Sequence, residues 1–196
     1  TSIYTDFKPK GALDPIEPAL ILPEVIDPKG WLDGKHYLGD EDRLVYLWAA
    51  SPEPHVVINT TMVQPEEIKS YQDLLNPKWK GKIMINDPSL EGPGRRGFVD
   101  AIYHKFVEPD FFRQLVKRQD VAVSRDDNLM NTWLVRGKYP IVLWPNNGRL
   151  PEYIEAGAPI DSVTQKEGIS IRAGGAALLL MNRAPNPKAA IVFINW

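Results

Sequence analysis

The stretch that decides the fold covers residues 73–97 and reads DLLNPKWKGKIMINDPSLEGPGRRG. Its centre, residues 82–86, is a short apolar run of the kind that forms a buried strand, and Asp87-Pro88 ends it. The following loop is rich in glycine and proline and leads into a helix predicted over 94–107, with one apolar face formed by Phe98, Ile102 and Phe106. This order of strand, loop and helix is the basic unit of an α/β protein.

The same alternation continues on both sides of this stretch. Apolar runs predict strands at 55–59, 120–124, 140–144, 160–164 and 176–181. Helical spacing and proline or glycine signals predict helices at 65–75, 109–117, 126–135, 151–156 and from Pro187 onward. Strands that alternate with helices predict an α/β fold with a mostly parallel sheet flanked by helices.

Both ends of the sequence differ from this regular part. Residues 1–54 contain many prolines and little periodicity, which disfavours regular helices and leaves one short strand predicted at 44–48. The segment also contains aromatic residues that can be buried, and so we expect it to wrap a core. The last predicted helix, 187–196, carries no stop signal, and so we interpret the sequence as truncated at both ends.

Composition excludes several classes of function. The 196 residues carry a formal net charge of −2 and no basic runs, which gives no argument for nucleic-acid binding. The absence of cysteine excludes disulfides, thiolate metal sites and cysteine nucleophiles. The three histidines lack paired spacing, and no serine lies in a Gly-x-Ser-x-Gly context. We therefore expect no catalytic residues, no metal and no cofactor.

Three loops follow predicted strands and are candidates for ligand contact, because ligands of α/β sheets bind beyond the carboxyl ends of the strands. In the first loop the glycines allow close backbone approach, and the helix N-terminus and arginines favour an anion. Its candidate residues are Ser89, Gly92, Gly94, Arg95 and Arg96. The loop lacks a P-loop or dinucleotide pattern, and it is equally compatible with a flexible connection bearing solvated arginines.

The second and third loops add polar and aromatic candidates. Ser124 and Arg125 end a strand, while Asp126 or Asp127 is expected to cap the next helix. The third loop offers Trp144, Asn146 and Asn147, a mixture expected in a polar small-molecule cleft, although Asn-Asn-Gly is also a good turn.

One longer pattern is more specific than these spacing arguments. Residues 57–60, 65–82 and 87–88 together resemble bacterial extracellular solute-binding proteins of ABC importers, and more narrowly their ferric-iron-type branch. The most specific part is Asp-Leu-Leu-x-Pro-Lys-Trp-Lys-Gly-Lys at 73–82. Residues 137–141, 157–159 and 174–190 extend the resemblance, which covers about residues 55–196.

The resemblance implies a type II periplasmic-binding-protein fold with two lobes that close on a ligand. Residues 1–54 would be a remnant of lobe one, 55–167 the ligand-binding lobe two, and 168–196 the return crossing and the start of a lobe-one helix. Asn59, near the outward crossing, joins the candidate ligand contacts. Iron-binding members use adjacent tyrosines in the region 144–153, where this chain has Asn146-Asn147 and an isolated Tyr153.

The implied function is the substrate-binding component of an ABC import system that captures a small polar or anionic solute. A ferric-iron-binding protein and a sensory ligand-binding domain are the alternatives. The expected partners are the solute and, in the full-length protein, the transporter permease, with the protein itself monomeric. The expected location is periplasmic or extracellular, with lipid anchoring to the cell surface as one option.

Overall fold

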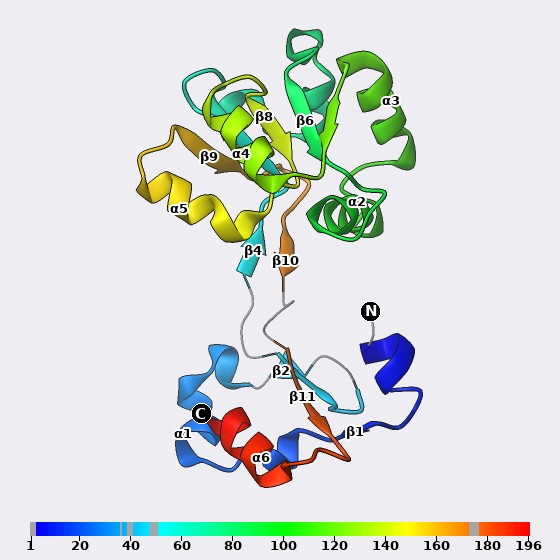
Figure 1. Ribbon diagram of the computed structural model, residues 1–196, viewed down its shortest axis with the longest axis vertical. Coiled ribbons are helices and arrows are strands. Elements are labelled where there is room, and N and C mark those ends of the chain that lie inside the picture. The colour runs from blue at the N-terminus through cyan, green and yellow to red at the C-terminus, as the bar shows by residue number, and fades with distance from the viewer. Residues whose placement is uncertain (1–2, 36, 39–40, 48–50, 173–176) are drawn as a thin grey trace. The chain divides into compact units, whose positions relative to one another are not determined.

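The chain forms two compact units in a computed structural model that describes residues 3–35, 37–38, 41–47, 51–172 and 177–196 (Figure 1). A few side chains within these ranges, including that of Asn147, are not described. Unit 1 comprises Thr1–Ser51 and Arg172–Trp196, and unit 2 comprises Pro52–Ile171. Strands β4 (Ser51–Glu53) and β10 (Ser170–Arg172) pair where the chain passes between the units.

Unit 2 is built on a five-stranded mixed sheet with the strand order β7-β6-β8-β5-β9. Its strands are β5 (Val56–Asn59), β6 (Ile83–Asn86), β7 (Ala122–Ser124), β8 (Ile141–Leu143) and β9 (Ile160–Val163). Strand β6 is parallel to both β7 and β8. Strand β5 is antiparallel to both its neighbours, β8 and β9. Four strands therefore share one direction, as the sequence pattern predicts, and β5 alone runs the opposite way.

Helices cover both faces of this sheet. Successive residues of a strand point to opposite faces, so each strand contributes side chains to two cores. On one face Ile58 and Leu143 belong to a core that includes Ala101 of α2 (Pro93–Tyr103) and residues of α3 (Pro109–Gln119). On the other face Val57 and Val142 belong to a second core, formed with α4 (Asp127–Val135) and with Leu150 of α5 (Leu150–Glu155). This two-sided burial explains why the strands read as continuous apolar runs.

The prediction of a helix at 65–75 is wrong. The segment forms separate 3-10 turns, η5 (Pro65–Glu67) and η6 (Tyr71–Leu75), followed by η7 (Pro77–Trp79). The physical reason is local capping: the Ser70 side chain accepts from the Gln72 amide, and Asp73 accepts from the Ser70 amide, so a new turn starts at Ser70. Of the predicted apolar face, Ile68 and Tyr71 are buried and Leu75 is partly buried, while its neighbour Leu74 is also buried.

Unit 1 contains a four-stranded antiparallel sheet with the order β1-β11-β3-β2. These strands are β1 (Leu13–Asp14), β11 (Ala177–Met181), β3 (Val45–Leu47) and β2 (Tyr37–Leu38). Strand β3 matches the strand predicted at 44–48, whose last residue lies outside the described ranges. The remaining elements are short turns, apart from α1 (Pro23–Ile26) and the nine-residue α6 (Pro187–Asn195).

Asn195 of α6 holds the N-terminal segment of unit 1 in place. Its Oδ1 accepts hydrogen bonds from the backbone amides of Ile21 and Leu22, and its Nδ2 donates to the carbonyl of Ala19. Across the described ranges, no helix combines the length and apolar character needed to cross a bilayer.

Candidate functional site

Three strand ends bring the predicted loops together in unit 2. Asn86 at the end of β6 pairs with Ser124 at the end of β7, and Ile85 pairs with Leu143 at the end of β8. We call this side of the sheet, with its loops 87–92, 124–126 and 144–149, the carboxyl edge. All three loops predicted to contact a ligand therefore lie at one edge of one sheet, next to the N-termini of α2 and α4.

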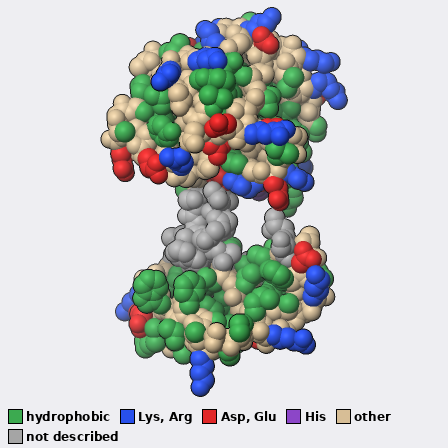
Figure 2. Space-filling model, viewed as in Figure 1, with side chains coloured by type: hydrophobic (Ala, Val, Ile, Leu, Met, Phe, Trp, Pro, Cys, Tyr) green, Lys and Arg blue, Asp and Glu red, His purple; other side chains and the backbone are tan. Residues whose placement is uncertain are grey.

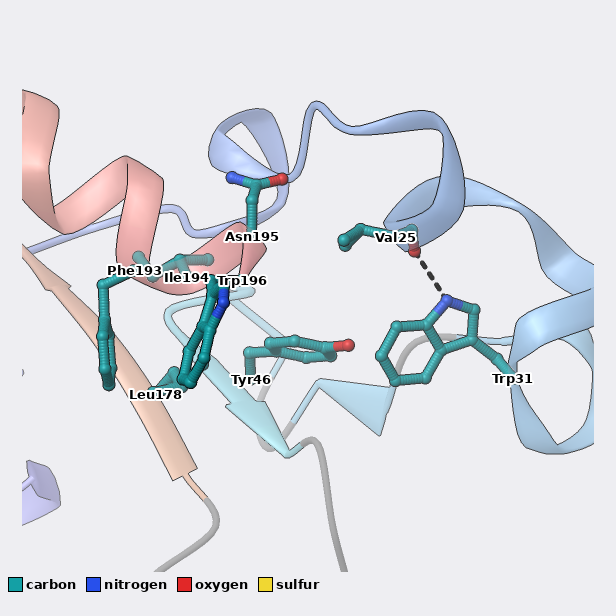
Figure 3. A pocket seen from close by; sticks show the side chains of 8 residues that line it. All are labelled: Val25, Trp31, Tyr46, Leu178, Phe193, Ile194, Asn195 and Trp196. Atoms are coloured by element: carbon teal, nitrogen blue, oxygen red, sulfur yellow. Dashed lines mark hydrogen bonds between the residues drawn. The ribbon is translucent and has the colours of Figure 1, made fainter.

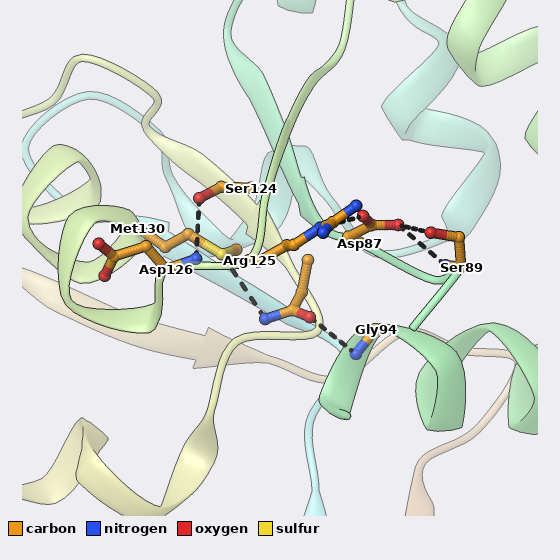
Figure 4. Close-up of polar contacts among 8 residues, drawn as sticks. Asp87, Ser89, Gly94, Ser124, Arg125, Asp126 and Met130 are labelled. Carbon is orange, nitrogen blue, oxygen red and sulfur yellow. Dashed lines mark hydrogen bonds and ion pairs between the residues drawn. The ribbon is translucent and has the colours of Figure 1, made fainter. Parts of the chain in front are cut away.

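Asp87 is the centre of a polar cluster at the carboxyl edge (Figure 4). Its Oδ1 accepts hydrogen bonds from the amide of Ser89 at 2.9 Å and from the Ser89 hydroxyl at 2.6 Å. Its Oδ2 accepts from Nε of Arg125 at 2.9 Å. These contacts, those of Ser89 first and that of Arg125 after them, lower the pKa of Asp87 to about 2. Two predicted contact residues are thus brought together, but the charge of Arg125 is already paired.

Gly94 packs directly against the end of β6. Its amide donates to Oδ1 of Asn86 at 3.1 Å, and a Cβ on Gly94 would lie only 2.3 Å from the Asn86 carbonyl oxygen. No side chain fits in that space. Gly92, the residue before α2, has φ 152, a backbone conformation that favours glycine. The two glycines therefore allow α2 to begin in contact with the strand end.

The carboxylate of Asp127, which the sequence predicts only as a possible helix cap, connects the end of β6 with the third loop. Oδ1 of Asp127 accepts from Nδ2 of Asn86 at 3.0 Å, and its Oδ2 accepts from Nδ2 of Asn146 at 2.9 Å. Oδ1 of Asn146 in turn accepts from the amide of Gly148 at 3.3 Å. Of the two acidic residues, Asp126 is the cap of α4, because its side chain accepts from the Leu129 amide. The sequence pattern does not predict Asn86 as a site residue, because Asn86 is the last residue of an apolar run.

The arginines of the first loop differ in their contacts. Nη2 of Arg96 lies 3.5 Å from Oε1 of Glu53, so its charge has a partner. Arg95 is exposed, and within the described ranges it forms no ion pair. Arg149, in the third loop, donates to Oδ1 of Asn128 at 2.7 Å. Arg95, in the first turn of α2, therefore differs from these arginines in having no ion-pair partner among the described residues.

Trp144 is buried in the core of unit 2 and has almost no exposed surface, and its contact with a ligand stays a prediction. Only 3% of the residue is exposed, and its ring packs at 5.4 Å from that of Phe112 and 6.3 Å from that of Phe98, centroid to centroid. A Cβ on Gly97 would approach Cδ1 of Trp144 to 2.0 Å. The adjoining cavity, which His55 and Gly97 also line, measures about 10 Å³, at most the space of one water molecule.

Asn59 lies at the opposite edge of the sheet from the other candidates, and its contact with a ligand stays a prediction. Because β5 is antiparallel to β8, the end of β5 meets the start of β8, where the Asn59 amide donates to the Pro140 carbonyl. Its Nδ2 donates to the carbonyls of Leu134 and Val135, and its Oδ1 accepts from Thr61. Asn59 thus satisfies the end of α4. The remaining candidate side chain, Asn147, lies outside those described, although its backbone begins the turn Asn147–Arg149.

The described residues contain no group of three or more His, Cys, Asp or Glu side chains that could hold a metal ion. Tyr153, the isolated tyrosine in the region used by iron-binding members, is half-buried and packs on the core with Leu150. The surface of unit 2 visible in Figure 2 intermixes Lys and Arg with Asp and Glu.

Unit 1 contains an apolar cavity of about 310 Å³ (Figure 3). Trp31 and Tyr46 form part of its lining, with their rings edge to face at 5.7 Å between centroids, and Trp31 Nε1 donates to the Val25 carbonyl at 2.6 Å. Burial raises the pKa of Tyr46 to about 12. The polar lining residue Asn195 uses its amide group for the backbone bonds described above. The cavity thus offers an apolar surface with few polar groups to orient a ligand.

Comparison with known proteins identifies the fold. No protein-family model matches the chain. The chain is 26% identical over 156 residues to the spermidine/putrescine-binding periplasmic protein of Escherichia coli. The aligned region covers 77% of this chain and 43% of that relative. The chain thus spans less than half the length of this relative.

Two solved structures resemble the chain more completely. The ferric binding protein from Campylobacter jejuni has a TM-score of 0.65 and 15% identity, with 100% of this chain and 62% of that chain covered. The fructose-6-phosphate-bound periplasmic binding protein AfuA from Actinobacillus pleuropneumoniae has a TM-score of 0.59 and 21% identity, over 96% of this chain and 58% of that chain. The chain therefore has the fold of the type II periplasmic binding proteins, as its sequence pattern predicts.

Proposed function

We propose that this chain belongs to the substrate-binding component of an ABC import system and contacts its solute at the carboxyl edge of unit 2. The observation that carries the proposal is the convergence of three polar loops at the ends of β6, β7 and β8, where α/β sheets bind ligands. The relatives reported above are named as binding proteins, which supports a role in binding rather than catalysis. In the proposed whole protein, residues 55–167 form the ligand-binding lobe.

The proposed solute is small and polar, and it carries a carboxylate or phosphate group. Arg95 supports this choice, because its guanidinium is exposed beside the first turn of α2 and can give bidentate hydrogen bonds to such a group. Gly92, where an added Cβ would meet nothing within 4 Å, keeps the backbone near Arg95 open to close approach. AfuA, of the same fold, is described with bound fructose-6-phosphate, a solute of this chemical class.

A cationic amine is the second candidate solute. Asp127 supports it, because within the described ranges this carboxylate accepts only amide N–H groups and pairs with no lysine or arginine. The relative from Escherichia coli is named for spermidine and putrescine, which are amines of this kind. Whichever solute binds, the proposed location is periplasmic or extracellular, and the proposed partner is a transporter permease.

Isothermal titration calorimetry of the purified chain tests these proposals with inorganic phosphate, citrate, fructose-6-phosphate, spermidine and ferric citrate. We expect a phosphate or carboxylate solute to bind, and Arg95→Ala to weaken its binding about tenfold. Arg113→Ala is the matched control, because Arg113 is equally exposed but pairs with Asp110 on α3. Binding of spermidine alone would replace the anionic class by the cationic one. Equal losses from both variants, or no binding of any solute, would reject the proposed site.

A further inference from the structure

We propose that Asp127 is a positioning residue that fixes both the start of α2 and the third loop, 144–149, at the carboxyl edge. The inference rests on the proposed function only in treating this edge as the solute-binding surface. The hydrogen bonds on which it depends are present without any solute.

The two oxygens of Asp127 accept from two different elements, the end of β6 and the third loop. One accepts from Asn86 at 3.0 Å and the other from Asn146 at 2.9 Å. An amide side chain can adopt two orientations that exchange its oxygen and nitrogen, and the surrounding hydrogen bonds decide between them. Because a carboxylate only accepts, Asp127 forces both Asn side chains to turn their NH₂ groups toward it.

This orientation leaves both amide oxygens facing backbone donors. Oδ1 of Asn86 accepts from the amide of Gly94 at 3.1 Å, in the first turn of α2. Oδ1 of Asn146 accepts from the amide of Gly148 at 3.3 Å, in the third loop. One carboxylate therefore determines, through two Asn side chains, where the backbone is held at the start of α2 and in the third loop.

Burial makes a reversed orientation of the Asn86 amide energetically costly. Asn86 is only 5% exposed, so an Asn86 side chain in the wrong orientation would lack solvent to satisfy its polar atoms. Its Nδ2 also lies 3.6 Å from Sδ of Met130, a weak acceptor that cannot replace the carboxylate. The neighbouring Asp126 contacts neither asparagine in the described structure and bonds instead to the Leu129 amide.

The test is amide hydrogen exchange of Gly94 and Gly148, measured by NMR on the full chain without solute. Asp127→Asn places an NH₂ group against one of the two asparagine NH₂ groups, so we expect exchange at Gly94 or Gly148, or at both, to accelerate about tenfold. The matched control is Asp126→Asn, which keeps a good helix cap and should leave both amides within about twofold of the parent.

Exchanging the amide and the carboxylate between positions 86 and 127 tests whether protection of the two glycine amides can be restored. In the double variant Asn86→Asp with Asp127→Asn, the new carboxylate can accept from Gly94 and from the new amide, whose oxygen can accept from Asn146. We expect exchange at Gly94 and Gly148 to return to within about threefold of the parent. Asn146→Ala should accelerate Gly148 and leave Gly94 unchanged.

The outcomes separate clearly. Unchanged exchange in Asp127→Asn, equal acceleration in Asp126→Asn, or failure of the double variant to restore protection would each overturn the proposal. If Asp127→Asn does not fold, a folded double variant with parental exchange supports it, and an unfolded double variant counts against it. Because no solute is used, the positioning role and the solute-binding function can fail independently.

Discussion

The hydroxyl of Ser170 lies 2.8 Å from Nε2 of His55, and this buried contact joins residues 115 positions apart in the chain. The other ring nitrogen, Nδ1, bonds to the hydroxyl of Tyr71. His55 precedes β5, where the chain enters unit 2, and Ser170 begins β10, where the chain leaves it. The imidazole of His55 therefore links the entering and the leaving segments by a hydrogen bond. Burial raises the pKa of Tyr71, with a smaller contribution from Glu167, and keeps its hydroxyl protonated.

The pH dependence of stability should report this histidine. Burial lowers the pKa of His55 from 6.5 to about 4. Between these values the unfolded chain binds a proton that the folded chain resists, so stability is lost as the pH falls from about 6.5 to about 4. The expected loss reaches about 3 kcal/mol and does not grow further below that range through this group. Urea unfolding at several pH values measures it.

The variant His55→Gln should flatten that dependence, whereas His104→Gln, at an exposed position, should retain it. An unchanged slope in the His55 variant would show that other groups cause the acid sensitivity.

The titration of Asp87 is a second measurable consequence. Its pKa of about 2 depends first on hydrogen bonds from Ser89 and then on Arg125. We therefore expect Ser89→Ala, which removes the hydroxyl bond, and Arg125→Gln, which removes the charge, each to raise the pKa of Asp87 in a carboxyl ¹³C titration. Ser124→Ala is the control, because the Ser124 hydroxyl accepts from the Asp126 amide and does not contact Asp87. An unchanged pKa of Asp87 in either variant would contradict the contribution of the residue that was replaced.

Replacement of Gly97 should reveal how closely α2 approaches the sheet. In an open helix, alanine is about 1 kcal/mol more favourable than glycine. Here a Cβ would meet the Trp144 ring at 2.0 Å, so we expect Gly97→Ala to lower the free energy of unfolding by about 1–3 kcal/mol. Gly148→Ala, with ordinary contact at 3.5 Å, should change it by less than about 0.5 kcal/mol. Urea unfolding compares the two; a stabilised Gly97→Ala would refute the close packing.

The structural role of Asn59 can be separated from solute contact. Asn59→Ala removes two hydrogen bonds to the end of α4, so we expect a loss of about 1–3 kcal/mol in urea unfolding. Thr61→Ala, which deletes only a hydroxyl bonded to Asn59 Oδ1 on an exposed residue, should cost less than about 1 kcal/mol. Calorimetry with the same solute panel should give parental affinity for both. Loss of binding in Asn59→Ala at parental stability would instead support the predicted ligand contact of Asn59.

Local signals were sufficient for most of the secondary structure. Helices α3 and α4 follow the predicted ranges within a few residues, because proline at the first position and an aspartate cap are signals contained in the segment itself. Helix α2 ends at Tyr103, earlier than predicted, where Lys105 adopts φ 56. No continuous helix forms at 65–75, because hydrogen bonds that cap separate turns within this segment outweigh the helical preference of its apolar spacing.

The candidate site was less predictable, because strand direction and burial depend on distant residues. Asn59 and Asn86 both end apolar runs, but β5 is antiparallel to β8, and this direction alone separates them onto opposite edges. Trp144 follows a strand like the other candidates, but Gly97, 47 positions earlier in the chain, leaves the space that buries its ring. Neither fact has a local signature.

The sequence by itself determined the α/β alternation, the fold family resemblance and the loops that meet at the carboxyl edge, since these follow from local periodicity, turn residues and the 73–82 motif. Only the tertiary structure decided which side chains in those loops are free. Arg125 is paired with Asp87, Trp144 is buried, and Asp127 holds Asn86 from 41 positions away. Hydrogen bonds and packing of that range form only when the strands are assembled, and no local pattern encodes the partner.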